Sequence, residues 1–106
     1  MKILINVQDM HNNLEIRVDY DNNKMFINDQ ICSYDARVFA ARLVAITYDW
    51  PERLEDAKVF DGERYSIKIQ HNHKITEKVG INKFPDNYVL FKVLLSEVDN
   101  VRTKNN

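Results

Sequence analysis

The segment from Tyr34 to Trp50 constrains the fold most, because its apolar residues recur with the period of an α-helix. They form one broad apolar face, which consists of Ala36, Phe39, Ala40, Leu43, Ile46 and Trp50. A narrow polar stripe contains Asp35, Arg42 and Asp49, and alanines and valines fill most of the remainder. We therefore expect a helix with its N-cap at Ser33 that is covered over about three quarters of its circumference and ends at the following proline.

Three strands are predicted before this helix. Lys2–Gln8 has apolar residues on both faces, as expected of an interior strand. Leu14–Tyr20 alternates between apolar and polar residues, which is typical of a strand with one buried face. A third strand is expected at residues 24–28, after a turn rich in Asp and Asn.

The second half of the chain repeats this order. A short strand at residues 57–60 is predicted to form a tight hairpin with Glu63–Gln70 through the turn Asp61-Gly62. A further strand is expected at residues 73–79.

Pro85 is well suited to the first turn of a second helix, which we expect to run to about Val98. The chain is therefore predicted to have an α+β fold, in which an antiparallel sheet of about six strands carries two helices on one face, in the order βββα-βββα. Residues 1–99 are expected to form a single domain, and residues 100–106 a frayed C-terminal tail.

Composition narrows the class of protein. The apolar fraction of 44% and the charged fraction of 29% are ordinary for soluble proteins, and no signal peptide or membrane span is apparent. The single cysteine, Cys32, excludes an internal disulfide. We expect a cytoplasmic protein that does not associate with membranes. The abundance of Asn, Ile and Lys suggests AT-rich coding, as in a low-GC bacterium or its phage.

No motif predicts catalysis. The sequence has two glycines and lacks a phosphate-binding loop, a nucleophile elbow and a cysteine pair, so we predict neither an enzyme nor a cofactor. His11, His71 and His73 could in principle meet as a three-histidine metal site. We interpret them as turn residues and predict no metal, and a metal-binding or enzymatic role is kept as a lesser alternative.

Basic residues are concentrated after residue 62. Alternation along two neighbouring strands predicts that Arg64 and Lys68 share one face with Lys74 and Lys78. Four positive charges on one open hairpin face would attract phosphates. A nucleic-acid-binding module is therefore our alternative hypothesis, and a solvated row of lysines that protects the sheet edge is the simpler interpretation.

Two apolar features predict a partner-binding surface. On the second helix, the predicted core stripe comprises Tyr88, Leu90, Phe91, Leu94, Leu95 and Val98. This stripe leaves Val89 and Val93 one turn apart on the other side. The second feature is an aromatic residue, Trp50, that is followed by the acidic residues Glu52, Glu55 and Asp56.

The leading functional prediction follows by elimination. We expect a small non-catalytic protein that docks on another macromolecule and modulates or inhibits it, in the manner of an inhibitor, an immunity protein or a phage anti-defence protein. A protein is the expected partner, and nucleic acid is the alternative. The protein itself is expected to be a monomer or a homodimer.

Overall fold

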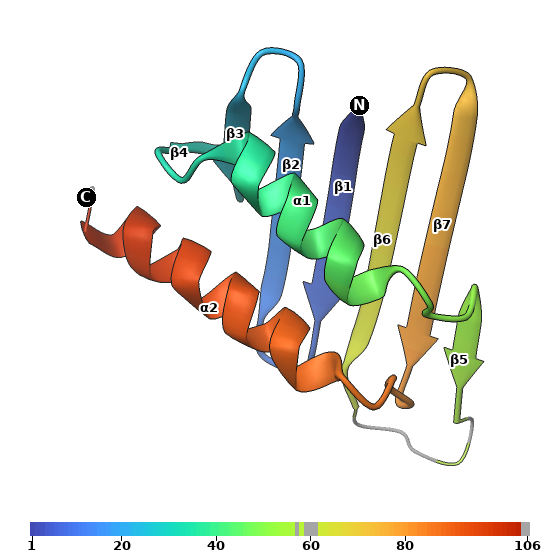
Figure 1. Cartoon of the computed structure of the whole chain (residues 1–106). Coiled ribbons are helices and arrows are strands. Elements are labelled where there is room, and N and C mark those ends of the chain that lie inside the picture. Colours follow the sequence, from blue (N-terminus) through green and yellow to red (C-terminus); the bar gives the residue numbers. More distant parts are fainter. Residues whose placement is uncertain (57, 59–61, 105–106) are drawn as a thin grey trace.

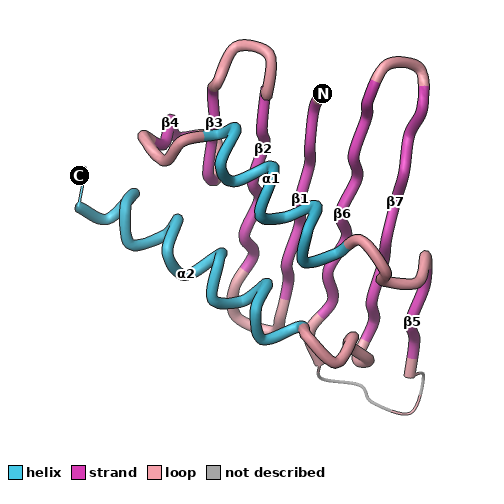
Figure 2. The backbone as a smooth tube through the Cα atoms, in the orientation of Figure 1, coloured by secondary structure: helices cyan, strands magenta, loops and turns pink. Residues whose placement is uncertain are grey.

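The computed structural model describes residues 1–56, 58 and 62–104, and it contains two helices on one face of a seven-stranded sheet (Figures 1 and 2). The predicted α+β class is confirmed. The strands are β1 (Lys2–Gln8), β2 (Asn13–Asp19), β3 (Lys24–Ile27), β4 (Gln30–Cys32), β5 (Arg53–Glu55), β6 (Arg64–His71) and β7 (Lys74–Ile81). The helices are α1 (Ala36–Thr47) and α2 (Tyr88–Lys104).

The strand order across the sheet is β4-β3-β2-β1-β6-β7-β5. β1 lies at the centre and pairs along its whole length with β2 and with β6, which confirms the predicted interior strand. All strand pairs are antiparallel except β5 with β7, which are parallel. The two helices cross the same face of this sheet, so its other face is left open (Figure 1).

The element order is ββββαβββα, which differs from the predicted order at β4 and β5. β4 was not predicted, because only Asn28 and Asp29 separate it from β3 and both adopt positive φ angles, of 48° and 67°. With a turn this short, the sequence shows no loop that would separate β3 from β4, so the second strand was not inferred.

The predicted hairpin before Glu63–Gln70 is wrong, since β1 and β7 already occupy both edges of β6. The first strand of the second half is instead β5, which precedes the predicted segment and pairs in parallel with β7. Residues 57, 59 and 60 of the predicted strand, and Asp61 of its turn, lie outside the described residues.

The N-cap of α1 is Asp35 instead of the predicted Ser33. The Asp35 carboxylate accepts hydrogen bonds from the backbone N–H groups of Arg37 and Val38, at 2.9 and 3.1 Å. These bonds satisfy amides that the first helical turn leaves without partners. An acidic side chain at this end also interacts favourably with the helix dipole.

The core lies between the helices and the sheet. Residues buried there include Ile16, Val18, Phe39, Leu43, Ile67, Phe91, Leu94 and Leu95. Ile46 and Ile69 are partly buried. The predicted coverage of α1 was too high, because Val38 and Val44 are exposed. No further layer covers the outer side of α1 (Figure 1).

α2 extends to Lys104, so the prediction that it ends near Val98 is too short. Val98 is buried, and Val101, three residues later, packs partly against the same core. The apolar spacing of a helix thus continues into the segment predicted to be frayed. Residues 105–106 of that segment lie outside the described residues.

Candidate interaction surface

The outward side of α2 carries three apolar side chains within little more than one turn. Val89, Leu90 and Val93 expose 65%, 52% and 47% of their surfaces. The rotation of the helix is set by its buried side, which consists of Phe91, Leu94, Leu95 and Val98. Because that side faces the sheet, Val89 and Val93 face solvent. We refer to Val89, Leu90 and Val93 as the α2 strip.

The predicted exposure of Val89 and Val93 is confirmed, and their role in binding stays a prediction. Leu90 was placed in the core stripe, and this is wrong because half of its surface is exposed. The sheet-facing side of a single helix is narrower than the six-residue stripe that was predicted. The apolar surface on α2 is therefore one leucine larger than the sequence suggested.

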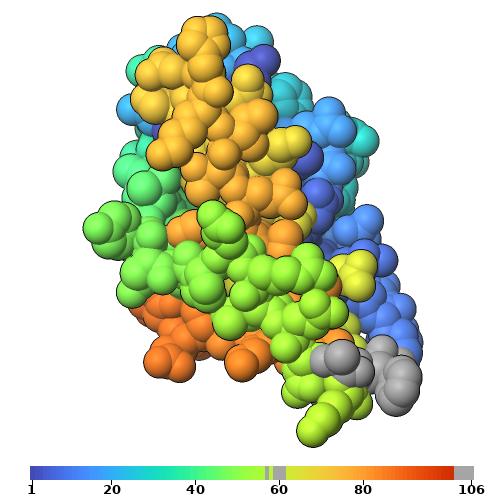
Figure 3. Space-filling view, turned by 90° about the vertical axis from the view of Figure 1, so that its right-hand side faces the viewer, coloured from blue at the N-terminus to red at the C-terminus, as the bar shows by residue number. Residues whose placement is uncertain are grey.

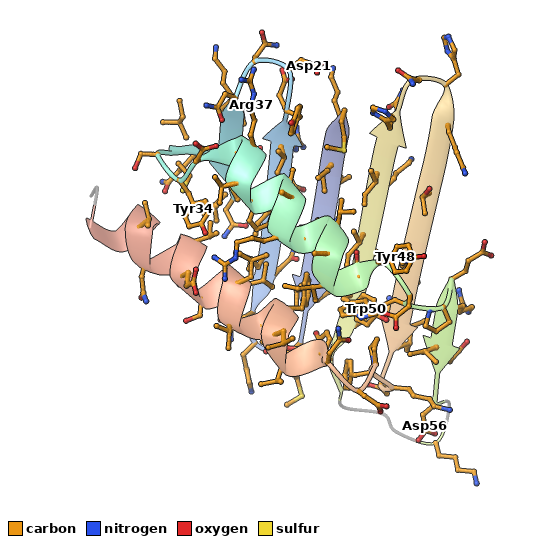
Figure 4. All side chains as sticks on the ribbon, viewed as in Figure 1. Asp21, Tyr34, Arg37, Tyr48, Trp50 and Asp56 are labelled. Atoms are coloured by element: carbon orange, nitrogen blue, oxygen red, sulfur yellow. The ribbon has the colours of Figure 1, made fainter. Side chains whose placement is uncertain are left out.

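An ion pair joins α2 to α1 beside this surface. The two terminal guanidinium nitrogens of Arg42 donate to the carboxylate of Glu97, and one of them also donates to the Tyr34 hydroxyl at 2.7 Å. Tyr34 lies between the two helices (Figure 4). The hydrogen bond from Arg42 lowers the pKa of the Glu97 carboxyl. Because both side chains are substantially exposed, the pair contributes little stability and mainly fixes how the helices lie.

A second set of contacts joins the start of α2 to β6. The carboxylate of Glu63 accepts hydrogen bonds from the Tyr88 hydroxyl and from the Lys92 ammonium, the latter at 2.6 Å. Burial and the Glu63 carboxylate raise the pKa of Tyr88 well above its ordinary value. The α2 strip therefore stands on a helix that is anchored on both sides.

Trp50 is not an interface anchor, because only 4% of its surface is exposed. Its ring contacts Tyr65 and Phe91, with centroid separations of 5.2 and 5.5 Å. Its indole N–H donates to Oδ1 of Asn87 at 2.6 Å. The prediction that Trp50 binds a partner is wrong, since the ring closes the end of the core between α1 and α2 (Figure 4).

The three acidic residues predicted with Trp50 lie along the sheet edge. Glu52 is exposed, and Glu55 forms an ion pair with Arg53 at 3.1 Å. The Asp56 carboxylate accepts a hydrogen bond from the backbone N–H of Lys58 at 3.0 Å. The green segment that contains β5 crosses the surface next to β7 (Figure 3). The predicted partner-binding set is thus split between this edge and α2.

Further exposed side chains lie where the end of α1 approaches the start of α2, and the sequence pattern gave no signal that they would lie together. Tyr48 follows α1 and exposes 81% of its surface. Asp49 and Asp86 are exposed, and Asp86 precedes Val89 by three residues. The Asn87 side-chain amide donates to the backbone carbonyl of Ile46 at 2.9 Å, which holds the end of α1 beside the start of α2. Asp86 is therefore an acidic neighbour of the strip at its N-terminal end.

The four basic residues predicted on one hairpin face are divided between two faces. Arg64 and Lys68 lie on the open face of the sheet, whereas Lys74 and Lys78 pair with His71 and Ile67 on the helix-covered face. The prediction of a four-charge face is therefore wrong, because the two-residue turn shifts the alternation on β7 by one position relative to β6. Whether any of these residues binds nucleic acid stays untested.

Lys78 has a structural role on the helix side. Its ammonium donates to the backbone carbonyl of Thr47 and, at 3.1 Å, to that of Tyr48. These carbonyls end α1, where a cation satisfies unpaired acceptors and interacts favourably with the helix dipole. The engaged ammonium is not available to a phosphate.

The three histidines do not come together. His11 lies in the turn after β1, where Gln8 pairs with Arg64. His71 and His73 lie at the other end of the sheet, where Lys2 pairs with Gln70. Six residues of extended strand separate these ends by about 20 Å. The described residues contain no group of three His, Cys, Asp or Glu side chains that could hold a metal ion.

No family model, curated protein or solved structure matches the chain. Within the residues that the structure describes, no helix is long and apolar enough to cross a membrane.

Proposed function

We propose that this protein is a non-catalytic binding protein that docks on another protein through the α2 strip and modulates its activity. The observation that carries the proposal is the run of three exposed apolar side chains, Val89, Leu90 and Val93, on a helix whose opposite side is fully packed. Apolar surface of this kind gains free energy when a partner covers it.

The partner's chemistry follows from what borders the strip. Asp86 is exposed three residues before Val89, while Lys92 is engaged by Glu63. A complementary surface would present an apolar patch with basic residues at one margin. Full desolvation of the two valines would contribute about 2 to 3 kcal/mol, which corresponds to one to two decades in Kd.

The test compares the wild-type protein with Val89→Asp/Val93→Asp. Purified tagged proteins are used to capture partners from nuclease-treated host lysate, and self-association is measured by sedimentation velocity. The matched control is Ile31→Asp/Ile75→Asp, which changes two exposed apolar residues on β4 and β7. Its net charge equals that of the α2 variant. We expect a protein partner or a homodimer that the wild type and the control form and the α2 variant does not.

Two results would contradict the proposal. One is unfolding of the α2 variant, which would mean that the valines belong to the core. The other is an α2 variant that keeps its fold and also retains every partner of the wild type. Thermal unfolding followed by circular dichroism separates these outcomes.

A further inference from the structure

The open face of the sheet holds a shallow depression of about 630 Å³. Leu4 of β1 and Phe26 of β3 line it, and both side chains are half-buried. In the sheet register, Leu4 pairs with Arg17 on one side and with Lys68 on the other, and Arg17 pairs with Phe26. A single row across four adjacent strands therefore alternates between apolar and cationic side chains.

Four cations on this face have no hydrogen bond or ion pair within the described part of the chain, namely Lys2, Lys24, Arg64 and Lys68. Arg17, by contrast, forms an ion pair with Glu15 at 2.7 Å. Arg64 and Lys68 lie four residues apart on β6, and Lys2 pairs with the residue two positions beyond Lys68. Lys2, Lys68 and Arg64 thus form a row that extends for about 20 Å along the strand direction.

Acidic side chains also lie on this face, and Asp19 pairs in register with Lys2. Asp19 accepts a hydrogen bond from the Asn22 side chain at 2.7 Å. Asp29, in the turn between β3 and β4, lines the depression together with Lys2 and Lys68, and Glu77 lies on β7. Glu77 pairs in register with Lys68, but the described residues show no ion pair between them.

We propose that the open sheet face binds single-stranded nucleic acid, with phosphates on Lys2, Arg64 and Lys68 and unpaired bases on Phe26 and Leu4. A line of phosphates complements a line of unpaired cations, and every base has a π-face that can stack on an aromatic ring. A duplex hides its bases and would leave the apolar floor uncovered. This surface lies on the opposite side of the sheet from α2, so the proposal is independent of the α2 strip.

The test measures fluorescence anisotropy of a labelled thymidine oligonucleotide, about twelve nucleotides long and therefore within the usual site size, as protein is added at low ionic strength. Lys68→Glu should weaken binding at least about tenfold. The matched control, Lys74→Glu, makes the same charge change in the same hairpin but on the other face, and should have little effect. Phe26→Ala should weaken binding about fivefold or more, as expected for the loss of one stacked base.

Salt titration provides a second readout. Three phosphate contacts on a single strand predict a slope of log K against log salt of about −2. The proposal is overturned if no binding occurs at low salt, if Lys68→Glu and Lys74→Glu behave alike, or if polyglutamate competes as well as unlabelled oligonucleotide. The last result would show that an acidic protein surface is the occupant. Val89→Asp/Val93→Asp should bind the oligonucleotide normally, so failure of either proposal can be distinguished.

Discussion

Tyr65 of β6 lies over Gly80 of β7, its direct partner across the strand pair. A Cβ atom on residue 80 would lie 2.0 Å from Cε1 of the tyrosine ring, so the ring fits only because residue 80 has no side chain. Gly80 does not have a positive φ angle, which means that space, not backbone freedom, requires glycine here. The ring in turn contacts Trp50 and Tyr88, so this glycine shapes the aromatic end of the core.

Gly80→Ala should lower the free energy of unfolding by about 1 to 3 kcal/mol, because the added methyl group must displace a buried ring. Urea denaturation followed by tryptophan fluorescence measures the change. Tyr65→Phe is the control: the described residues offer its buried hydroxyl no hydrogen-bond partner, so its removal should cost little. A Gly80→Ala protein as stable as the wild type would show that the ring can move freely.

Trp50→Ala should lower the free energy of unfolding by about 3 to 5 kcal/mol, because the side chain is buried and its indole N–H is hydrogen-bonded. Tyr48→Ala, only two residues earlier, should change it by less than about 0.5 kcal/mol, because that ring is exposed. Both values come from urea denaturation monitored by circular dichroism. Unchanged stability of Trp50→Ala would contradict the role of this ring in closing the end of the core.

The sequence predicted the parts of the fold that depend on strong local periodicity. The apolar spacing in α1 identified Phe39 and Leu43 as core residues, and the continuous apolar run of β1 identified the central strand. Exposure of Val89 and Val93 followed from the same periodicity in α2. In each case one face of a regular element must be buried, and the spacing of apolar residues within a single segment indicates which face that is.

The errors occurred where neighbours distant in sequence decide the outcome. Three residues of β5 pair in parallel with β7, and no local pattern in Arg53–Glu55 indicates this. Lys78 and Lys68 appear equivalent in sequence, but the length of the hairpin turn sends them to opposite faces. The sequence around Trp50 is typical of an exposed anchor. Its burial depends on distant residues such as Asn87, which directly precedes α2 and accepts a hydrogen bond from the indole N–H.

Lys78→Met should lower the free energy of unfolding by about 1 to 2 kcal/mol, because the change removes a cation from the carbonyl end of α1 and retains an apolar stem. The matched control is Lys74→Met, since Lys74 is exposed at the hairpin tip. Thermal unfolding at two salt concentrations provides the comparison. Equal stability of the two variants would contradict a capping role for Lys78.

Tyr88 should make the protein sensitive to alkaline pH. Burial, followed by the hydrogen bond to Glu63, raises the pKa of its hydroxyl in the folded state. In the unfolded chain this group ionises near pH 10. A group whose folded pKa is raised contributes stability that is complete below its unfolded pKa and is lost as pH rises toward the folded pKa. The free energy of unfolding should therefore decline from about pH 10 upward.

The measurement is urea denaturation at intervals from neutral pH to above about pH 10, for the wild type and for Tyr88→Phe. The variant keeps the ring and its packing but cannot ionise, so its stability should fall less steeply over the alkaline range. Parallel curves would mean that the Tyr88 hydroxyl ionises equally readily in the folded and unfolded states, which its burial argues against.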